Sequence, residues 1–84
     1  MKWEKIRNLA PNSCVLIEAI TAYSQDNKRI IKEMSLLEKY SNEKEAWSGY
    51  KQFHREHPEK ELYILHTGNK DIEIEESVSH KHWN

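Results

Sequence analysis

The chain has 84 residues, of which 37% are hydrophobic and 32% are charged, and its formal net charge is −1. This length predicts one domain with a small core, and the absence of an apolar run of about 18 residues excludes a membrane-spanning helix. A near-neutral charge gives no general attraction to nucleic acid or to anionic lipid. Cys14 is the single cysteine, and the charged N-terminus lacks an apolar signal segment, so we expect a cytoplasmic protein.

The first predicted elements are a short helix and a strand. Trp3, Ile6 and Leu9 recur at helical spacing, and Pro11 ends that segment. Residues 13–23 then combine consecutive apolar side chains with β-branched and aromatic residues, which favours a strand. Because apolar residues occupy both alternating positions, we expect both faces of this strand to be covered, as in a central strand.

Residues 29–40 fit two structures. Ile30, Ile31, Met34 and Leu37 follow a helical stripe, and the residue types favour a helix. However, residues 24–28 contain Asp and Asn, which tolerate positive φ and suit a hairpin turn. The preceding strand also needs an antiparallel neighbour. We therefore predict a strand here, with a helix as the alternative.

A more distinct helix follows. Asn42 can cap it, and Glu45 stands three residues later, as in a capping box. Gly49 costs about 1 kcal/mol relative to alanine inside a helix, and close approach of another backbone is one reason for it. Pro58 ends the segment. The predicted apolar stripe contains Ala46, Trp47, Tyr50, Phe53, His54 and His57.

The last elements predicted are two strands joined by a hairpin. Residues 61–67 read as a strand with Leu62, Ile64 and His66 on one face and Tyr63, Leu65 and Thr67 on the other, and Gly68-Asn69 suits a two-residue turn. Residues 71–75 would point Ile72 and Ile74 inward. We thus predict one α+β domain over residues 1–76, with a four-stranded antiparallel ββαββ sheet, one main helix and a short N-terminal helix. Residues 77–84 are predicted to be a flexible tail.

This order of elements resembles that of small uncharacterised bacterial proteins with a strand–strand–helix–strand–strand architecture. The resemblance extends over residues 11–76. It supports a strand at 29–37 and implies no activity. The segments that carry it are Pro11-Asn12, Val15-Leu16-Ile17-Glu18, Glu45-Ala46-Trp47, Tyr50, His54, Pro58 and Glu61-Leu62-Tyr63-Ile64-Leu65-His66-Thr67.

Histidines are the first candidates for chemistry. His54 and His57 are three residues apart on one helix, a spacing that can bring two imidazoles to one metal, and His80 and His82 offer further ligands. The competing interpretation is that His54 packs beside Tyr50 and that His57 caps the helix. Because a zinc site needs three or four ligands in fixed geometry, we favour the structural interpretation and predict no bound metal.

The carboxylates and the single thiol are no stronger candidates for a catalytic or metal-binding site than the histidines. Asp71, Glu73 and Glu75 alternate on one strand beside Lys70, an arrangement that can hold magnesium but that also protects a sheet edge from aggregation. Cys14 has no recognisable activating partner, and glycine-rich phosphate loops are absent. We therefore predict a protein that is not an enzyme and that has no cofactor.

A shortage of helices to cover the sheet leads to the functional hypothesis. An apolar sheet face needs a lid, which the N-terminal helix or a second copy of the chain can supply. We expect a small interaction or regulatory module, homodimeric, that binds protein through a sheet face or edge. The expected contact residues are Trp3, Ile6, Ile17 and Tyr63. The alternative is nucleic-acid binding through the basic helix residues Lys44, Lys51 and Arg55.

Overall fold

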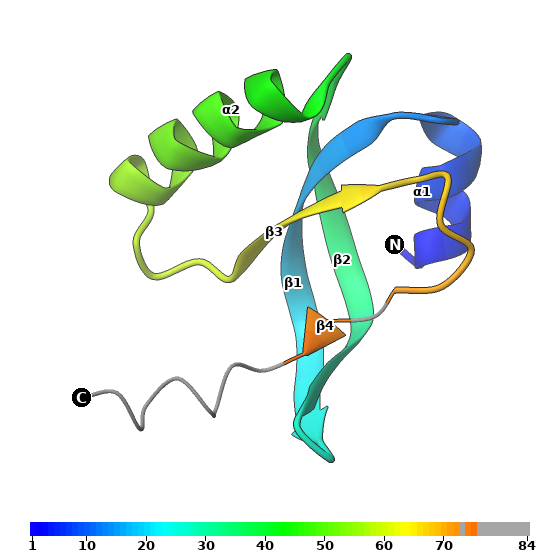
Figure 1. Ribbon diagram of the computed structural model, residues 1–84. Coiled ribbons are helices and arrows are strands. Elements are labelled where there is room, and N and C mark those ends of the chain that lie inside the picture. The colour runs from blue at the N-terminus through cyan, green and yellow to red at the C-terminus, as the bar shows by residue number, and fades with distance from the viewer. Residues whose placement is uncertain (73, 76–84) are drawn as a thin grey trace.

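The computed structural model describes residues 1–72, 74 and 75, which form two helices and four strands (Figure 1). The predicted tail at 77–84, with His80 and His82, and the predicted strand position Glu73 lie outside the described residues. In the described part, no helix is long and apolar enough to cross a membrane. The elements in chain order are α1 (Trp3–Leu9), β1 (Cys14–Gln25), β2 (Lys28–Tyr40), α2 (Glu43–Glu56), β3 (Leu62–His66) and β4 (Ile74–Glu75).

The α+β class is confirmed, but the predicted four-stranded ββαββ sheet is wrong. Three antiparallel strands in the order β2-β1-β3 make the sheet, and β4 adds only a two-residue pairing at the outer side of β2. The predicted hairpin between residues 61–67 and 71–75 does not form. A two-residue hairpin of the favoured kind needs positive φ, whereas neither Gly68 nor Asn69 has it. After β3 the chain instead reaches the opposite edge of the sheet, where β4 pairs with β2.

The strand at residues 29–40 is confirmed, and the helical alternative is wrong. Asp26 and Asn27 have φ values of 53° and 63°, so they form the tight turn that joins β1 to β2. Tertiary pairing with β1 outweighs the helical preference of the residues in β2. The pairing register shifts at Leu37, Ile20 and Lys32, and such bulges add twist to the ribbon.

The two helices lie on opposite faces of the sheet (Figure 1). Side chains alternate along β1, so Val15 and Ile17 face α1 while Leu16 faces α2. On the α1 face, the buried cluster consists of Ile6, Ala10, Val15, Ile17 and Met34. On the α2 face, Leu16 and Ala46 are fully buried. The prediction that both faces of the central strand are covered is confirmed.

The local features predicted for α2 are confirmed in part. Asn42 Oδ1 accepts the Glu45 N–H at 2.9 Å, but the Glu45 carboxylate binds the Ser41 hydroxyl instead of completing a capping box. Gly49 leaves room for a side chain and not, as predicted, for another backbone, because a Cβ there would lie 1.8 Å from the Tyr40 hydroxyl. Trp47 is not in the core, since 49% of it is exposed.

Candidate interaction site at the free edge of β3

The two edges of the sheet differ in what covers them. On the outer edge of β2, the Met34 N–H donates to the Met1 carbonyl at 2.9 Å, and the Met1 amino group donates back to the Met34 carbonyl. Further along this edge, Lys28 and Arg29 pair with β4. On the other side of the sheet, β3 pairs with β1 and with no other strand in the described part of the chain. The edge of β3 is therefore open over the whole strand, whereas that of β2 is covered at residues 28, 29 and 34.

The pairing with β1 decides which backbone groups of β3 point outward. Glu61 O accepts the Ala19 N–H at 2.9 Å, and the Thr67 N–H donates to Ser13 O at 2.8 Å. In an antiparallel pair, every second residue bonds to the same neighbour. Residues 61, 63, 65 and 67 thus bond to β1, and the N–H and C=O groups of Leu62, Ile64 and His66 point away from the sheet.

Few of these outward backbone groups form hydrogen bonds within the described part of the chain. The His66 carbonyl accepts the Asn69 N–H at 3.1 Å. Within residues 1–72, 74 and 75, the N–H groups of Leu62, Ile64 and His66 and the carbonyls of Leu62 and Ile64 have no backbone partner. Unpaired groups of this kind form a template for another strand.

A buried threonine fixes the C-terminal end of β3. Thr67 is 2% exposed, and its hydroxyl donates to Ala10 O at 2.5 Å and accepts the Ser13 N–H at 2.8 Å. Arg7 Nε donates to the Thr67 carbonyl at 2.8 Å. The end of β3 is thereby tied to α1 and to the start of β1.

A charged cluster fixes the N-terminal end. The Arg29 guanidinium donates to both Glu61 carboxylate oxygens at 2.7 and 2.8 Å, and the Tyr63 hydroxyl donates to the same carboxylate at 2.5 Å. Hydrogen bonds from Arg29 lower the pKa of Glu61. Burial, followed by the bond to Glu61, raises the pKa of Tyr63 to about 12. The β3 strand is thus held rigidly at both ends.

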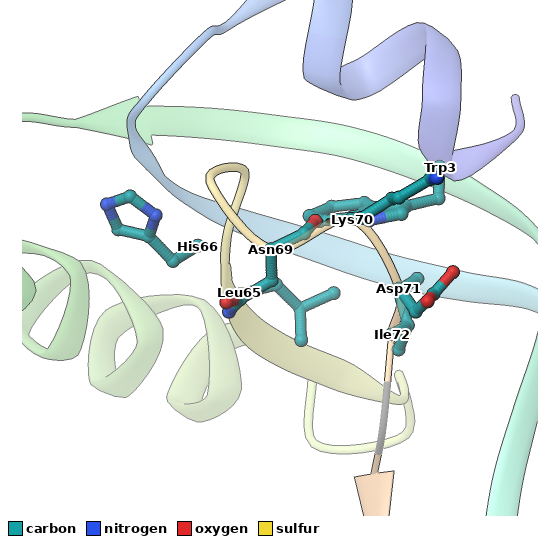
Figure 2. Close-up of a pocket in the computed structure, with 7 residues that line it drawn as sticks. All are labelled: Trp3, Leu65, His66, Asn69, Lys70, Asp71 and Ile72. Carbon is teal, nitrogen blue, oxygen red and sulfur yellow. Dashed lines mark hydrogen bonds between the residues drawn. The ribbon is translucent and has the colours of Figure 1, made fainter.

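A polar pocket lies beside the same strand, where residues 69–72 pass Trp3 (Figure 2). Trp3 Nε1 donates to the Asn69 carbonyl at 3.1 Å. The His66 imidazole and the Asp71 carboxylate lie at opposite ends of the view and do not converge. The cavity measures about 400 Å³ and is lined by Trp3, Leu65, His66, Asn69, Lys70, Asp71 and Ile72. Its polar groups offer no paired acid and base for catalysis.

The predicted contact residues are buried or partly buried, and they do not form an exposed surface. Ile6 and Ile17 are 0% exposed, and Trp3 and Tyr63 are partly buried against the same core. Their apolar character is explained by packing within the chain. The sheet face that needed a lid has one, because α1 covers it.

The predicted polar sites are also separated by the fold. Lys44, Lys51 and Arg55 are all exposed, and their spacing places them on the outer face of α2. His54 stacks on Tyr50 with ring centroids 5.7 Å apart, which confirms the packing expected for it. In the part of the chain that is described, no group of three His, Cys, Asp or Glu side chains could share a metal ion.

Sequence reasoning did not single out the outward groups of Leu62, Ile64 and His66. The alternation of β3 was visible, but a period of two does not tell which edge of a strand is paired. Comparison of the chain with protein-family models, with curated proteins and with solved structures gave no match.

Proposed function

We propose that the protein is a small, non-enzymatic interaction module that binds an extended segment of another polypeptide by adding it as a strand to the edge of β3. In this mode, main-chain hydrogen bonds provide affinity, and alternate side chains provide specificity. The single observation that carries the proposal is the difference between the two sheet edges. Met1 and β4 pair with that of β2 at residues 28, 29 and 34, while the outward groups of β3 lack a strand partner in the described residues.

The side chains of β3 suit such a partner. Leu62, Tyr63, Ile64 and Leu65 are consecutive and apolar, and only Leu62 of these is buried, whereas the other three are partly exposed. An added strand would therefore cover apolar area on both faces as well as pair its backbone. The free thiol of Cys14 supports a reducing compartment, so we propose that the module acts in the cytoplasm.

A proline substitution tests the strand-addition proposal. The probe is a fluorescent, end-capped peptide with the sequence of residues 61–67, and its binding is followed by anisotropy. In Ile64→Pro, the N–H that points outward is removed and the ladder to β1 is kept, because proline is tolerated at such edge positions. We expect peptide binding at least about tenfold weaker than for the wild type.

Glu43→Pro is the matched control. Glu43 is the first residue of α2, where the missing N–H costs little, and Asn42 before it already has extended φ and ψ of −151° and 169°. This variant should bind the peptide like the wild type. Equal binding by wild type and Ile64→Pro, or no binding by either, would contradict strand addition at β3.

A second candidate function is nucleic-acid binding through the outer face of α2. The observation that favours it is that the half-exposed Trp47 stands one helical turn from Lys51, so an aromatic ring and basic groups are within reach of one another. This function predicts affinity for a single-stranded oligonucleotide that falls steeply with salt. It also predicts loss of that affinity in the double variant Lys51→Glu plus Arg55→Glu.

The control for this second candidate is Lys5→Glu plus Lys32→Glu, which changes the net charge equally at two exposed lysines outside α2. Binding that responds equally to both double variants would show general charge attraction and would exclude α2 as the site.

A further inference from the structure

We propose that a second copy of this chain supplies the partner strand, so that two β3 strands pair antiparallel about a two-fold axis at Ile64. The inference rests on the proposed function, because it names the occupant of the same edge. A two-fold interface brings the same surface of both subunits together. The edge of β3 meets that requirement in its backbone, its side chains and its charges.

The backbone fixes the register. Only the even-numbered residues of β3 direct their N–H and C=O groups outward, so each must lie opposite an even-numbered residue of the second copy. With Ile64 opposite Ile64 of the second copy, Leu62 lies opposite His66 of that copy, and His66 lies opposite its Leu62. All three outward residues of each strand then form hydrogen-bonded pairs. A shift by two residues leaves one of them without a partner inside the strand.

Side chains in this register pair by kind on each face. The register with β1 places Ile64 opposite Leu16, on the α2 face, and Tyr63 opposite Ile17, on the α1 face. The two-fold thus brings two Ile64 side chains together on one face. On the other face, each Tyr63 meets Leu65 of the second copy. Such contacts between apolar side chains that face one another across two strands favour antiparallel pairing.

Charges at the two ends of β3 favour the antiparallel arrangement. Glu59, whose side chain is 70% exposed, precedes the strand, and the exposed Lys70 follows it. Antiparallel pairing about Ile64 brings the segment with Glu59 toward the end of the second copy's β3 that Lys70 follows. Parallel pairing would place like charges together. Opposite charges at the ends of a strand select orientation more than they add affinity.

The product is a sheet of twice the width with both faces still covered. Each copy contributes β2-β1-β3, and α1 and α2 remain on their own faces. The outer edges of this sheet would be the two β2 strands, on which β4 and Met1 already occupy positions 28, 29 and 34 in each copy. Pairing therefore uses both β3 edges and leaves no free β3 edge for a third copy, which predicts a dimer and not a fibre.

The experiment combines oligomeric state with cross-linking on the full chain. Sedimentation velocity over a wide concentration range should show a monomer that converts to a dimer, with no larger species. Ile64→Pro should shift the dissociation constant by at least about tenfold toward monomer. Ile20→Lys, which replaces an exposed apolar residue of β1, should leave it unchanged. A monomer at every concentration, or a dimer equally stable in Ile64→Pro, overturns the proposal.

Cross-linking tests the register without relying on a proline variant. In a Cys14→Ser background, Glu59→Cys and Asn69→Cys chains are mixed and treated with a short bismaleimide. The two-fold at Ile64 predicts that 59–69 products exceed 59–59 and 69–69 products by about tenfold. Equal yields, or mainly 59–59 products, overturn this register. If the chain stays monomeric yet binds the 61–67 peptide, dimerisation through β3 is refuted while strand addition stands. If the chain neither dimerises nor binds the peptide, both proposals are refuted.

Discussion

Thr67 shows how one side chain fixes the position of a strand end. Its hydroxyl is buried between the Ala10 carbonyl and the Ser13 N–H, and its own carbonyl accepts from Arg7. Both partners of the hydroxyl lie on the segment that joins α1 to β1. In the sequence, Thr67 was merely the last alternating residue of a strand. Its role depends on contacts more than 50 positions away along the chain.

We expect Thr67→Val to lower the free energy of unfolding by about 1–3 kcal/mol. The substitution keeps the shape of the side chain and leaves a buried N–H and a buried carbonyl without their partner. Urea unfolding followed by tryptophan fluorescence measures the change. Thr67→Ser retains the hydroxyl and is the control, with a smaller loss expected. Equal losses in the two variants would show that the methyl group, and not the hydroxyl, is important.

The α1 helix shows how an element of low intrinsic stability is held by packing. It has seven residues and no side-chain cap at its N-terminus, so it would not form in isolation. Trp3, Ile6 and Leu9 were predicted to lie on one stripe. Ile6 is 0% exposed, whereas Leu9 is 54% exposed. The stripe was recognisable from spacing, but its centre depends on how the helix is rotated against the sheet.

Ile6→Ala and Leu9→Ala should therefore differ strongly, although both truncate an apolar residue of the same helix. We expect Ile6→Ala to cost about 2–5 kcal/mol of unfolding free energy, because it leaves a cavity in the core of the α1 face. Leu9→Ala should change it by about 0.5 kcal/mol or less. Chemical denaturation of both variants measures the difference. Similar losses would mean that α1 does not cover the sheet in this orientation.

At the scale of the whole molecule, the cluster of Arg29, Glu61 and Tyr63 joins the two strands that flank β1. Arg29 belongs to β2, and Glu61 directly precedes β3. The Tyr63 hydroxyl donates its proton to the Glu61 carboxylate, so ionisation of Tyr63 would break that bond and place two negative charges together. This explains in part why the pKa of Tyr63 rises to about 12.

The raised pKa of Tyr63 predicts the sign of an alkaline pH dependence. Below pH 10, its usual value, the residue is neutral in both folded and unfolded chains, and its contribution to stability is fully present. Between pH 10 and about 12 the unfolded chain releases this proton more readily, so stability falls as pH rises.

Tyr63→Phe should reduce that decline when urea midpoints are measured from pH 9 to pH 12. Tyr23→Phe, which removes a hydroxyl from an exposed ring, should show the same alkaline decline in stability as the wild type. An alkaline decline of equal size in the wild type and Tyr63→Phe would contradict this role of the cluster.

The sequence by itself determined which segments form helices and strands, because that information is local. Hydrophobic spacing located α1, α2, β1 and β3, and the 24–28 turn, together with the need of β1 for an antiparallel neighbour, favoured a strand at β2 over its helical pattern. The cap at Asn42 and the small residue at Gly49 were also recognisable, since each depends on neighbours along the chain or on a requirement for space.

Tertiary structure decided where the segment after β3 lies and which sheet edge stays open. Gly68-Asn69 has the composition of a hairpin turn, yet Trp3 binds the Asn69 carbonyl and Ile72 packs against the core under α1, so the chain leads away from β3. The open edge follows from this path, because the residues expected to cover β3 cover β2 instead. Composition fixes which turns are possible, whereas contacts with distant residues select among them, and those contacts exist only in the folded chain.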